Sequence, residues 1–228
     1  KRAMMFEAID LILKCWTAAE PFDYEGQFWH GKRIAVEPKP LQKPHMPVGL
    51  ANSESIETAR YAGEQGFLPL HYYYDTAARL KELGVAFEQG AQAAGKDPSR
   101  SAIRVARFVH VGESDESARD EVRVAWQENL KWAKDGPAIA HVVRGLPEGG
   151  TVDDVTFDYL VDAGIFFVGS PDTVRRQATR FYQDMAGFGV LLFAVGYTFA
   201  TRAQRERSWR MFMLSLIHIS EPTRQAEI

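Results

Sequence analysis

The amino-acid sequence predicts an α/β fold in which helices cover a parallel sheet. Two observations carry this prediction: strand-like and helix-like stretches alternate along the chain, and the strand-like runs are apolar at almost every position. Near-continuous apolar strands are typical of parallel sheets that are buried on both faces. The pattern does not distinguish half of an open, doubly wound sheet from half of a (β/α)8 barrel.

The chain begins with a predicted helix, Arg2 to Trp16, whose apolar residues recur at close to helical spacing. Turn signals at Gly26 and Gly31 then predict a small hairpin or meander. Four prolines lie between Pro38 and Pro47. Because proline lacks a backbone donor and clashes with the preceding helical turn, this segment is predicted to be an extended connector.

Two pairs of a strand and a helix follow the connector. His45–Ala51 and Phe67–Tyr72 are short apolar runs that suit buried strands. The helix after the first strand, Ser55–Gly66, contains small residues for close packing and ends at a glycine. The second predicted helix extends from Asp75 to Gly95, where a glycine again ends it.

The remaining sheet residues are predicted at Ile103–Val111, which is strongly β-prone, and at Gly189–Val195. Between them, Ser114–Lys134 is a predicted helix whose acidic first turn is favourable near the positive helix N-terminus. Gly136–Asp162 is an irregular excursion rich in glycine. Ser170, followed by proline, predicts a capped helix start, and the stretch lacks the glycine pattern of a phosphate loop.

Composition narrows the function classes. The 228 residues are 46% hydrophobic and 25% charged, with a formal net charge of -3, which is ordinary for a globular protein. Lysine and arginine form no basic stripe, so we expect no nucleic-acid partner. No apolar run approaches the ~18 residues of a membrane span. The single cysteine excludes an internal disulfide and fits a reducing cytoplasm, and the histidines lack metal-ligand spacing.

The end of the chain, LSLIHISEPTRQAEI from Leu214 to Ile228, continues none of this periodicity. One codon spelling of the whole stretch matches a transposase end, a sequencing primer and an index from DNA library preparation. We therefore interpret 214–228 as a non-native tail and exclude it from the fold. Lys1 stands directly at a helical pattern, so we expect a fragment cut at both ends, with 1–213 forming one domain.

Several stretches carry a resemblance in order along the chain: RAMMFEAIDLILKCW, FDYEGQFW, PKPLQKPHMPV, ANSESIETARYAGEQGFLPL, RFVHVGESDESARDE and FVGSPDTVRRQATRFYQDMAGFGVLLFAV. Together they resemble the bacterial luciferase-like flavin monooxygenases, a family of (β/α)8 barrels. The resemblance implies a partial TIM barrel, roughly strands five to eight, with an insertion between strands seven and eight. The four predicted strands would fill these places and leave two unpaired edges and one bare face.

In such barrels the working residues lie on loops at the carboxyl ends of strands, here ANSESIET, HYYYD, HVGES and VGYTF. Hydroxyls and unpaired backbone N–H groups at a helix N-terminus suit a phosphate. Physical reasoning alone favours simple helix capping by Ser53 or Ser55. The resemblance implies instead that Ser55 and Thr58 bind the FMN phosphate, with Glu54 contributing backbone and Asn52 on the same loop.

The resemblance also implies an aromatic side chain against the flavin ring at about Tyr73. The structural alternative is that the tyrosines of HYYYD bury their rings as a cap and leave their hydroxyls in water. We name no catalytic residue, because those of the family belong to the half that precedes this sequence. We also predict no metal site.

The implied reaction is oxygenation of a small organic substrate by reduced FMN and O2, with the cofactor carrying the chemistry. A separate flavin reductase would supply reduced FMN, and the parent protein would be a cytoplasmic homo-oligomer that contacts neither nucleic acid nor membrane. The fragment alone would be inactive. The alternatives are a deazaflavin (F420)-dependent hydride-transfer enzyme of the same superfamily and a non-catalytic flavin-binding relative.

Overall fold

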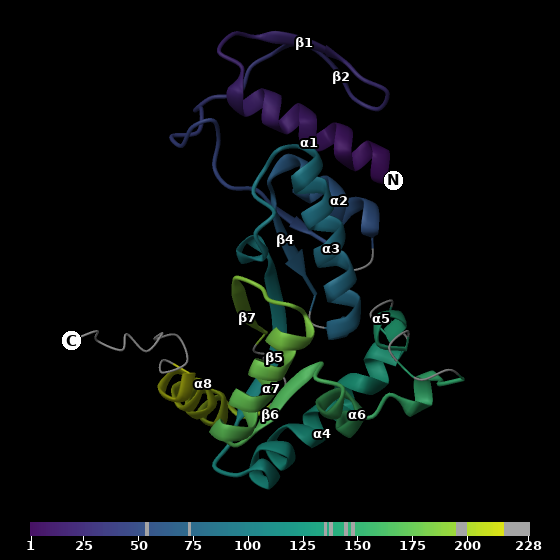
Figure 1. Ribbon diagram of the computed structural model, residues 1–228, viewed down its shortest axis with the longest axis vertical. Helices are drawn as coiled ribbons and strands as arrows, with labels where there is room; N and C mark the ends of the chain where they lie inside the picture. Colours follow the sequence, from purple (N-terminus) through teal and green to yellow (C-terminus); the bar gives the residue numbers. More distant parts are fainter. Residues whose placement is uncertain are drawn as a thin grey trace, which may run out of the picture. The chain divides into compact units, whose positions relative to one another are not determined.

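A computed structural model describes residues 1–52, 55–72, 74–134, 136, 139–143, 146, 149–194 and 200–216 (Figure 1). The chain divides into two compact units, Lys1–Val48 and Gly49–Ile228. The second unit has helices packed on a parallel sheet, which confirms the predicted α/β class.

The first unit contains one helix and one hairpin. Helix α1 is Arg2–Thr17, and strands β1 (Phe22–Glu25) and β2 (His30–Ile34) pair antiparallel, as the turn glycines predicted. The carboxylate of Glu7 on α1 accepts hydrogen bonds from the backbone N–H groups of Gln27, Phe28 and Trp29. These contacts join the helix to the hairpin turn.

The second unit is organised around one central strand. The parallel strands are β3 (Gly49–Ala51), β4 (Leu68–His71), β5 (Arg104–Val111), β6 (Phe166–Gly169) and β7 (Val190–Ala194). Strand β5 pairs with β4, β6 and β7, whereas β3 pairs with β4. Phe108 has partners in both β6 and β7, so these two strands lie on opposite edges of β5.

Strand β6 corrects the predicted strand count. The sequence predicted four strands and an irregular excursion from Gly136 to Asp162. The structure adds β6 directly after that excursion, and places within the excursion the short helices α5 (Ile139–Val143) and α6 (Phe157–Asp162) and a 3-10 turn, Val152–Asp154. Strand β6 has only four residues, which is too short to show a periodic pattern in the sequence. The glycines of the excursion indicated loops, so the short helices α5 and α6 were not predicted.

The other helices lie close to where the sequence predicted them. They are α2 (Ile56–Gln65), α3 (Ala77–Ala93), α4 (Asp115–Lys134) and α7 (Pro171–Asp184), with a 3-10 turn at Arg100–Ala102. Gly66 ends α2 in the left-handed conformation at φ 71°, which glycine adopts without steric cost. In the described chain, no helix combines the length and apolarity needed to cross a bilayer.

Helix α8 (Arg202–Leu216) was not predicted, and it extends three positions into the stretch interpreted as a non-native tail. The rest of that stretch, 217–228, lies outside the described residues. Helix α8 packs against β5 and α7. Its Phe212 is buried and meets the ring of Phe193 on β7 at 4.0 Å between centroids.

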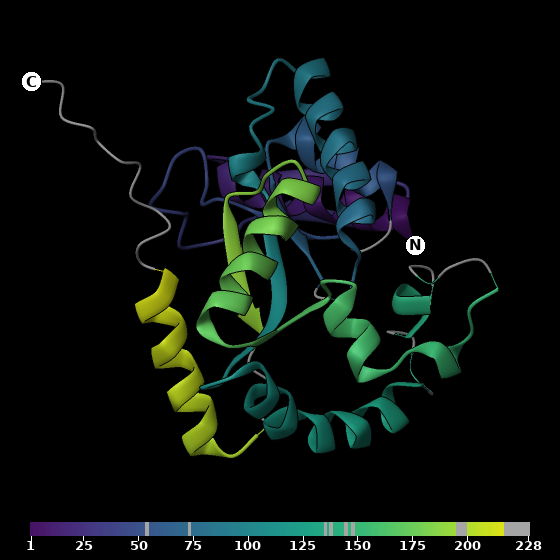
Figure 2. The same ribbon diagram turned by 60° about the horizontal axis from the view of Figure 1, so that its bottom comes forward.

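Helices cover one face of the sheet more completely than the other. Residues that pair across parallel strands point to the same face, so His71 and Val105 share one face, and Val190 and Leu192 lie on the other. Helix α7 lies across β5 and β7 (Figure 2) on the face of His71. On the second face Val190 and Leu192 remain 36% and 45% exposed. Part of that second face is therefore open to solvent.

A group of buried apolar side chains lies where β5, β6, α4 and α6 meet. The ring of Trp126 on α4 meets Phe166 edge-on at 4.6 Å, and Phe108 lies 4.8 Å from Phe166. Leu160 and Val161 of α6 complete this cluster. The excursion that looked irregular in sequence thus supplies part of the core.

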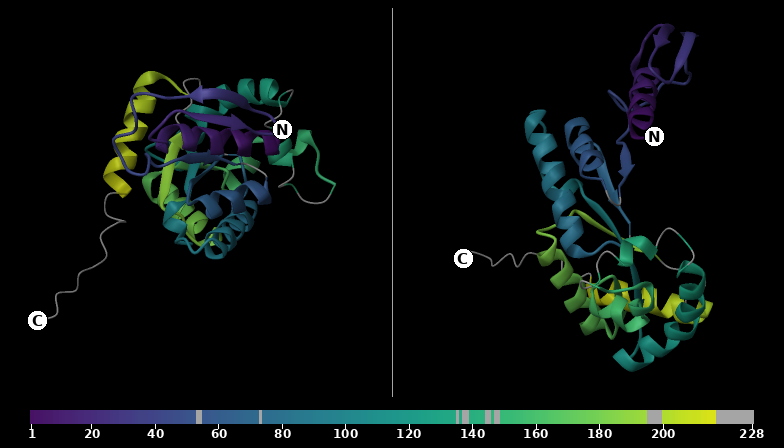
Figure 3. Two further views of the ribbon diagram at one scale, coloured as in Figure 1. Left: turned by 90° about the horizontal axis from the view of Figure 1, so that it is seen from above. Right: turned by 90° about the vertical axis from the view of Figure 1, so that its right-hand side faces the viewer.

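Helices α2 and α3 lie side by side (Figures 1 and 3) because glycines remove the side chains between them. A Cβ at Gly90 would lie 2.0 Å from the backbone oxygen of Arg60, and one at Gly63 would lie 2.1 Å from the oxygen of Phe87. The backbones of α2 and α3 therefore pack so closely that any residue larger than glycine at these two positions would collide with the facing helix.

Replacing Gly90 by alanine is expected to lower the free energy of unfolding by about 1–3 kcal/mol, because the two helices must separate. Urea denaturation followed by circular dichroism measures this loss. Gly84→Ala on the same helix is the matched control, since a Cβ there would meet the end of the Arg100 side chain rather than the backbone of another helix. An unfolding midpoint for Gly90→Ala at or above that of Gly84→Ala would contradict the packing argument.

Candidate functional site

The loop between β3 and α2 is fixed by the side chain of Asn52. Its Oδ1 accepts from the backbone N–H of Ser55 and its Nδ2 donates to the backbone oxygen of Ser55, both at 3.0 Å. The backbone N–H of Asn52 donates to Leu70 at 2.9 Å, which extends the pairing of β3 with β4. Asn52 is only 6% exposed, so it acts as an internal brace for the turn.

Ser55 caps helix α2. Its Oγ accepts a hydrogen bond from the backbone N–H of Thr58 at 3.0 Å, and its backbone is extended, as N-cap residues require. The hydroxyl proton of Ser55 remains available for an acceptor. Glu57 adds a negative charge in the first turn. Thr58 is 5% exposed, so Ser55 is the more accessible hydroxyl.

His71, the last residue of β4, holds the same loop from the neighbouring strand. Its Nδ1 lies 2.9 Å from the backbone oxygen of Asn52. A carbonyl only accepts, so Nδ1 carries the proton. Burial lowers the pKa of His71 to about 4, and the positive charge of Arg107 acts in the same direction. The imidazole is therefore neutral at pH 7, and its Nε2 has no hydrogen-bond partner among the described residues.

The segment between β4 and α3 carries the tyrosines. Tyr74 is 8% exposed, and its ring lies 6.1 Å from Phe166 and 6.3 Å from Trp126. Tyr72 is 36% exposed and meets the ring of Tyr74 edge-on at 5.5 Å. Tyr74 thus buries its ring in the core. This agrees with the alternative in which tyrosines of HYYYD pack as a cap rather than against a flavin.

Arg107, in the middle of β5, lies beneath this segment and is fully buried. Its guanidinium donates to the backbone oxygens of Asp75 at 2.6 Å, Ala106 at 2.8 Å and Tyr72 at 3.4 Å. Burial lowers the pKa of Arg107 to about 9, although the nearby Asp75 acts in the opposite direction. At pH 7 the side chain is charged and holds two carbonyls of the loop.

The carboxyl end of β5 is engaged in a separate network. His110 Nε2 lies 2.8 Å from a carboxylate oxygen of Glu121 on α4, and the other oxygen of Glu121 pairs with Arg207 on α8. Burial is the main cause that lowers the pKa of His110. Ser208 accepts from the backbone N–H of Val111 at 2.8 Å. This network ties β5 to two helices around a buried imidazole.

The structure brings together three of the predicted site residues, Asn52, Ser55 and Thr58. The other two, Glu54 and Tyr73, lie outside the described residues, as does the loop 195–199. The described residues contain no group of three or more metal-ligating side chains.

Sequence reasoning did not find His71 or Arg107. Arg107 had a signal, because it interrupts an alternation of valines, Val105, Val109 and Val111, at a position that should face the interior. His71 had no such signal in the sequence, since a histidine at the end of a strand can be either buried or exposed to solvent.

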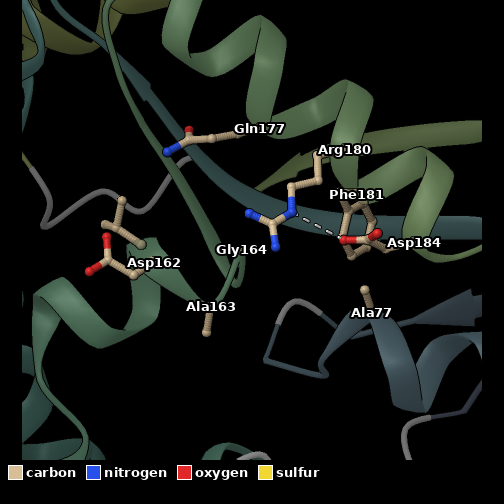
Figure 4. Close-up of a pocket in the computed structure, with 9 residues that line it drawn as sticks. Ala77, Asp162, Ala163, Gly164, Gln177, Arg180, Phe181 and Asp184 are labelled. Atoms are coloured by element: carbon tan, nitrogen blue, oxygen red, sulfur yellow. Dashed lines mark ion pairs between the residues drawn. The ribbon is translucent and has the colours of Figure 1, made fainter.

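A cavity of about 170 Å³ lies apart from these residues (Figure 4). It is lined by Ala77 of α3, by Val161 to Gly164 at the end of α6, and by Gln177, Arg180, Phe181 and Asp184 of α7. Arg180 pairs with Asp184 at 3.5 Å, and Gln177 donates to the backbone oxygen of Val168 at 3.4 Å. None of the predicted site residues lines it, so the candidate site remains the two loops after β3 and β4.

The sequence is similar to a known protein family and to curated proteins. The family model described as luciferase-like monooxygenase matches residues 1–187. Among curated proteins, 3,6-diketocamphane 1,6-monooxygenase of Pseudomonas putida is 26% identical over 210 residues, which span 82% of this chain and 54% of that protein. The chain therefore spans about half the length of the curated relatives it matches.

Solved structures share the fold. A monooxygenase from Streptomyces bottropensis superposes with a TM-score of 0.77 at 21% identity, over 96% of this chain and 62% of that one. A type II Baeyer-Villiger monooxygenase, the oxygenating constituent of 3,6-diketocamphane monooxygenase of Pseudomonas putida, was solved in complex with FMN. It gives a TM-score of 0.68 at 22% identity, over 95% of this chain and 61% of that one. A coenzyme F420 dependent tetrahydromethanopterin reductase from Methanopyrus kandleri gives 0.63 at 17% identity, over 95% and 63%.

Proposed function

Because the chain belongs to the luciferase-like monooxygenase family, we propose that it is part of an enzyme that uses reduced FMN and O2 to oxygenate a small organic substrate. The single observation that carries the proposal is the position of Ser55. It caps helix α2 directly after the carboxyl end of β3, where parallel α/β proteins bind phosphorylated cofactors.

The residues present fit the phosphate of FMN. The Ser55 hydroxyl can donate outward while its oxygen accepts from Thr58, and the positive end of α2 favours an anion at that place. Asn52 holds the turn, and we propose that Glu54 contributes backbone to the phosphate and Tyr73 an aromatic ring to the flavin. Bound reduced flavin would supply the electrons for activating O2. The chain's own residues would bind, orient and shield the cofactor.

We propose that residues 1–213 are the C-terminal half of a (β/α)8 barrel. Strands β3, β4, β5 and β7 would be barrel strands five to eight, and the insertion between the last two would contain α4, α5, α6 and β6. The open part of the sheet at Val190 and Leu192 supports this placement, since barrel strands face a filled interior. Residues 214–228 would be non-native, and the 228 residues alone would be inactive.

The partners follow from the reaction. A flavin reductase would supply reduced FMN in the cytoplasm, and the parent enzyme would be a homo-oligomer. The net charge of -3 supports the absence of a nucleic-acid partner.

The second candidate is a deazaflavin-dependent hydride-transfer enzyme. The likeness to the F420 dependent reductase, at a TM-score of 0.63, supports it. The two activities share a fold, so they must be separated by chemistry rather than by architecture.

The test uses the complete gene product, meaning the full open reading frame to which these residues belong. It is titrated with FMN and with F420, then supplied with reduced FMN and O2 in the presence of cyclic and aliphatic ketones. We expect saturable FMN binding and O2 consumption coupled to an oxygenated product. Hydride exchange with reduced F420 would favour the second candidate. FMN binding without turnover would indicate a non-catalytic relative, and binding of neither cofactor would overturn the proposal.

A further inference from the structure

Arg107 is a charged side chain at a fully buried position of β5. It is 0% exposed and lies on the helix-covered face of β5, with its guanidinium 4.0 Å from the centre of the Phe181 ring. Burying a charge is costly unless it makes good hydrogen bonds, and replacing buried ionic groups by apolar residues is often neutral or stabilising. A buried guanidinium at this place therefore calls for a role besides filling space.

That role is visible in the acceptors of its hydrogen bonds. Two of the three carbonyls that Arg107 holds, those of Tyr72 and Asp75, belong to the segment between β4 and α3. A guanidinium has five N–H donors in a fixed planar fork, so it can hold carbonyls that converge from different directions. Lysine offers a single, mobile donor group. The planar fork thus sets the spacing between the two ends of the segment.

A second anchor acts from the other side. Tyr74 places its ring against Phe166 and Trp126, in the core formed by α4, α6 and β6. The segment is therefore held through its backbone by Arg107 and through a side chain by Tyr74. The preceding loop has the same arrangement, since His71 on β4 holds the backbone oxygen of Asn52. In both cases a buried polar side chain on the next strand fixes the loop.

We propose that Arg107 is a positioning residue for flavin binding, which fixes the backbone oxygens of Tyr72 and Asp75 after the carboxyl end of β4, on one of the two loops of the candidate site. This inference rests on the proposed function. Phe181, which also lines the cavity beside α7, shields the guanidinium and keeps water from competing for the two carbonyls.

The test compares Arg107→Met, Arg107→Lys and the control Arg104→Met in the complete gene product. Arg104 lies on the same strand but donates to Ser101 and Ile103 at its other end. Hydrogen exchange of the amides in 72–77 reports on the segment itself. Dissociation constants for FMN and for riboflavin report on the cofactor, because riboflavin shares the ring but lacks the phosphate.

In Arg107→Met we expect exchange in 72–77 to rise about tenfold or more while the rest of the sheet is unchanged. We expect the dissociation constants of FMN and riboflavin to rise by the same factor, about ten, because a displaced segment affects the shared ring. Arg107→Lys should recover part of both losses, and Arg104→Met should match the wild type. If Arg107→Met does not fold, the lysine variant carries the test, with about threefold changes expected in both readouts.

Unchanged exchange in 72–77, or exchange that rises equally throughout the sheet, would overturn the proposal. So would unchanged affinity for both flavins, or a loss for FMN alone, which would place the effect at the phosphate. If the wild type binds neither flavin, the proposed function fails, and the positioning role in flavin binding fails with it. The exchange data then still decide whether Arg107 anchors the segment.

Discussion

Replacing Ser55 by alanine is expected to weaken FMN binding by the complete gene product by a factor of about ten or more. A hydrogen bond to a charged group contributes roughly 1.5–3 kcal/mol, and the variant loses the hydroxyl that we propose donates to the phosphate. Isothermal titration with FMN measures the change. Riboflavin is the internal comparison, because without a phosphate it should lose little affinity.

Ser55→Asp separates phosphate binding from helix capping. Aspartate retains the cap to the Thr58 N–H and so preserves α2, but its negative charge repels a phosphate. We expect it to weaken FMN binding more than alanine does, with riboflavin binding close to that of the wild type. Equal FMN affinity in the wild type and both variants would move the phosphate site away from this loop.

The stability of the second unit is expected to fall by about 3 kcal/mol between pH 7 and pH 4 on account of His71 alone. The folded-state pKa of His71 is lowered to about 4, from 6.5 in the unfolded chain. Above pH 6.5 both states are neutral at this site and the full stability is present. As the pH falls below 6.5 the unfolded chain takes up the proton first, so stability is lost progressively until the pH reaches about 4.

The variant His71→Asn tests this contribution. Its amide N–H can replace the donor to the Asn52 oxygen, and it does not titrate in this range. Urea denaturation at pH 4, 5, 6 and 7 should show a shallower loss of stability than in the wild type. Gly90→Ala, which changes no titratable group, is the control and should lower the stability by a similar amount at every pH. Parallel slopes for His71→Asn and the wild type would contradict the burial argument.

Much of the fold was predictable because its signals are local. The cap at Ser55, the glycine that ends α2 and the apolar run of β5 each depend on residues that are near one another in sequence. Strand β6 was not predictable, since four apolar residues acquire strand structure only by pairing with β5. Helix α8 has a weak apolar pattern and is held by contacts to β5 that sequence does not display.

The candidate site likewise has residues that the sequence predicted and supporting residues that it did not. Asn52, Ser55 and Thr58 follow from the chemistry of a loop before a helix, which is visible in one short stretch. The supports beneath the loops are not visible there. His71 acts on Asn52, and Arg107 acts on Tyr72 and Asp75, across strands that only the folded sheet brings together. Burial then changes their proton affinities, and burial is a property of the tertiary structure.

The central position of β5 has a consequence for how the chain assembles. Leu50 and Pro69 pair across a gap of 19 positions, whereas Arg104 and Val190 pair across 86. Loop closure entropy grows with the logarithm of this separation, so the β5–β7 pairing costs about 1 kcal/mol more to close than the β3–β4 pairing. The β3–α2–β4 segment can therefore form early, and the sheet is completed only when the distant end of the chain returns to its middle.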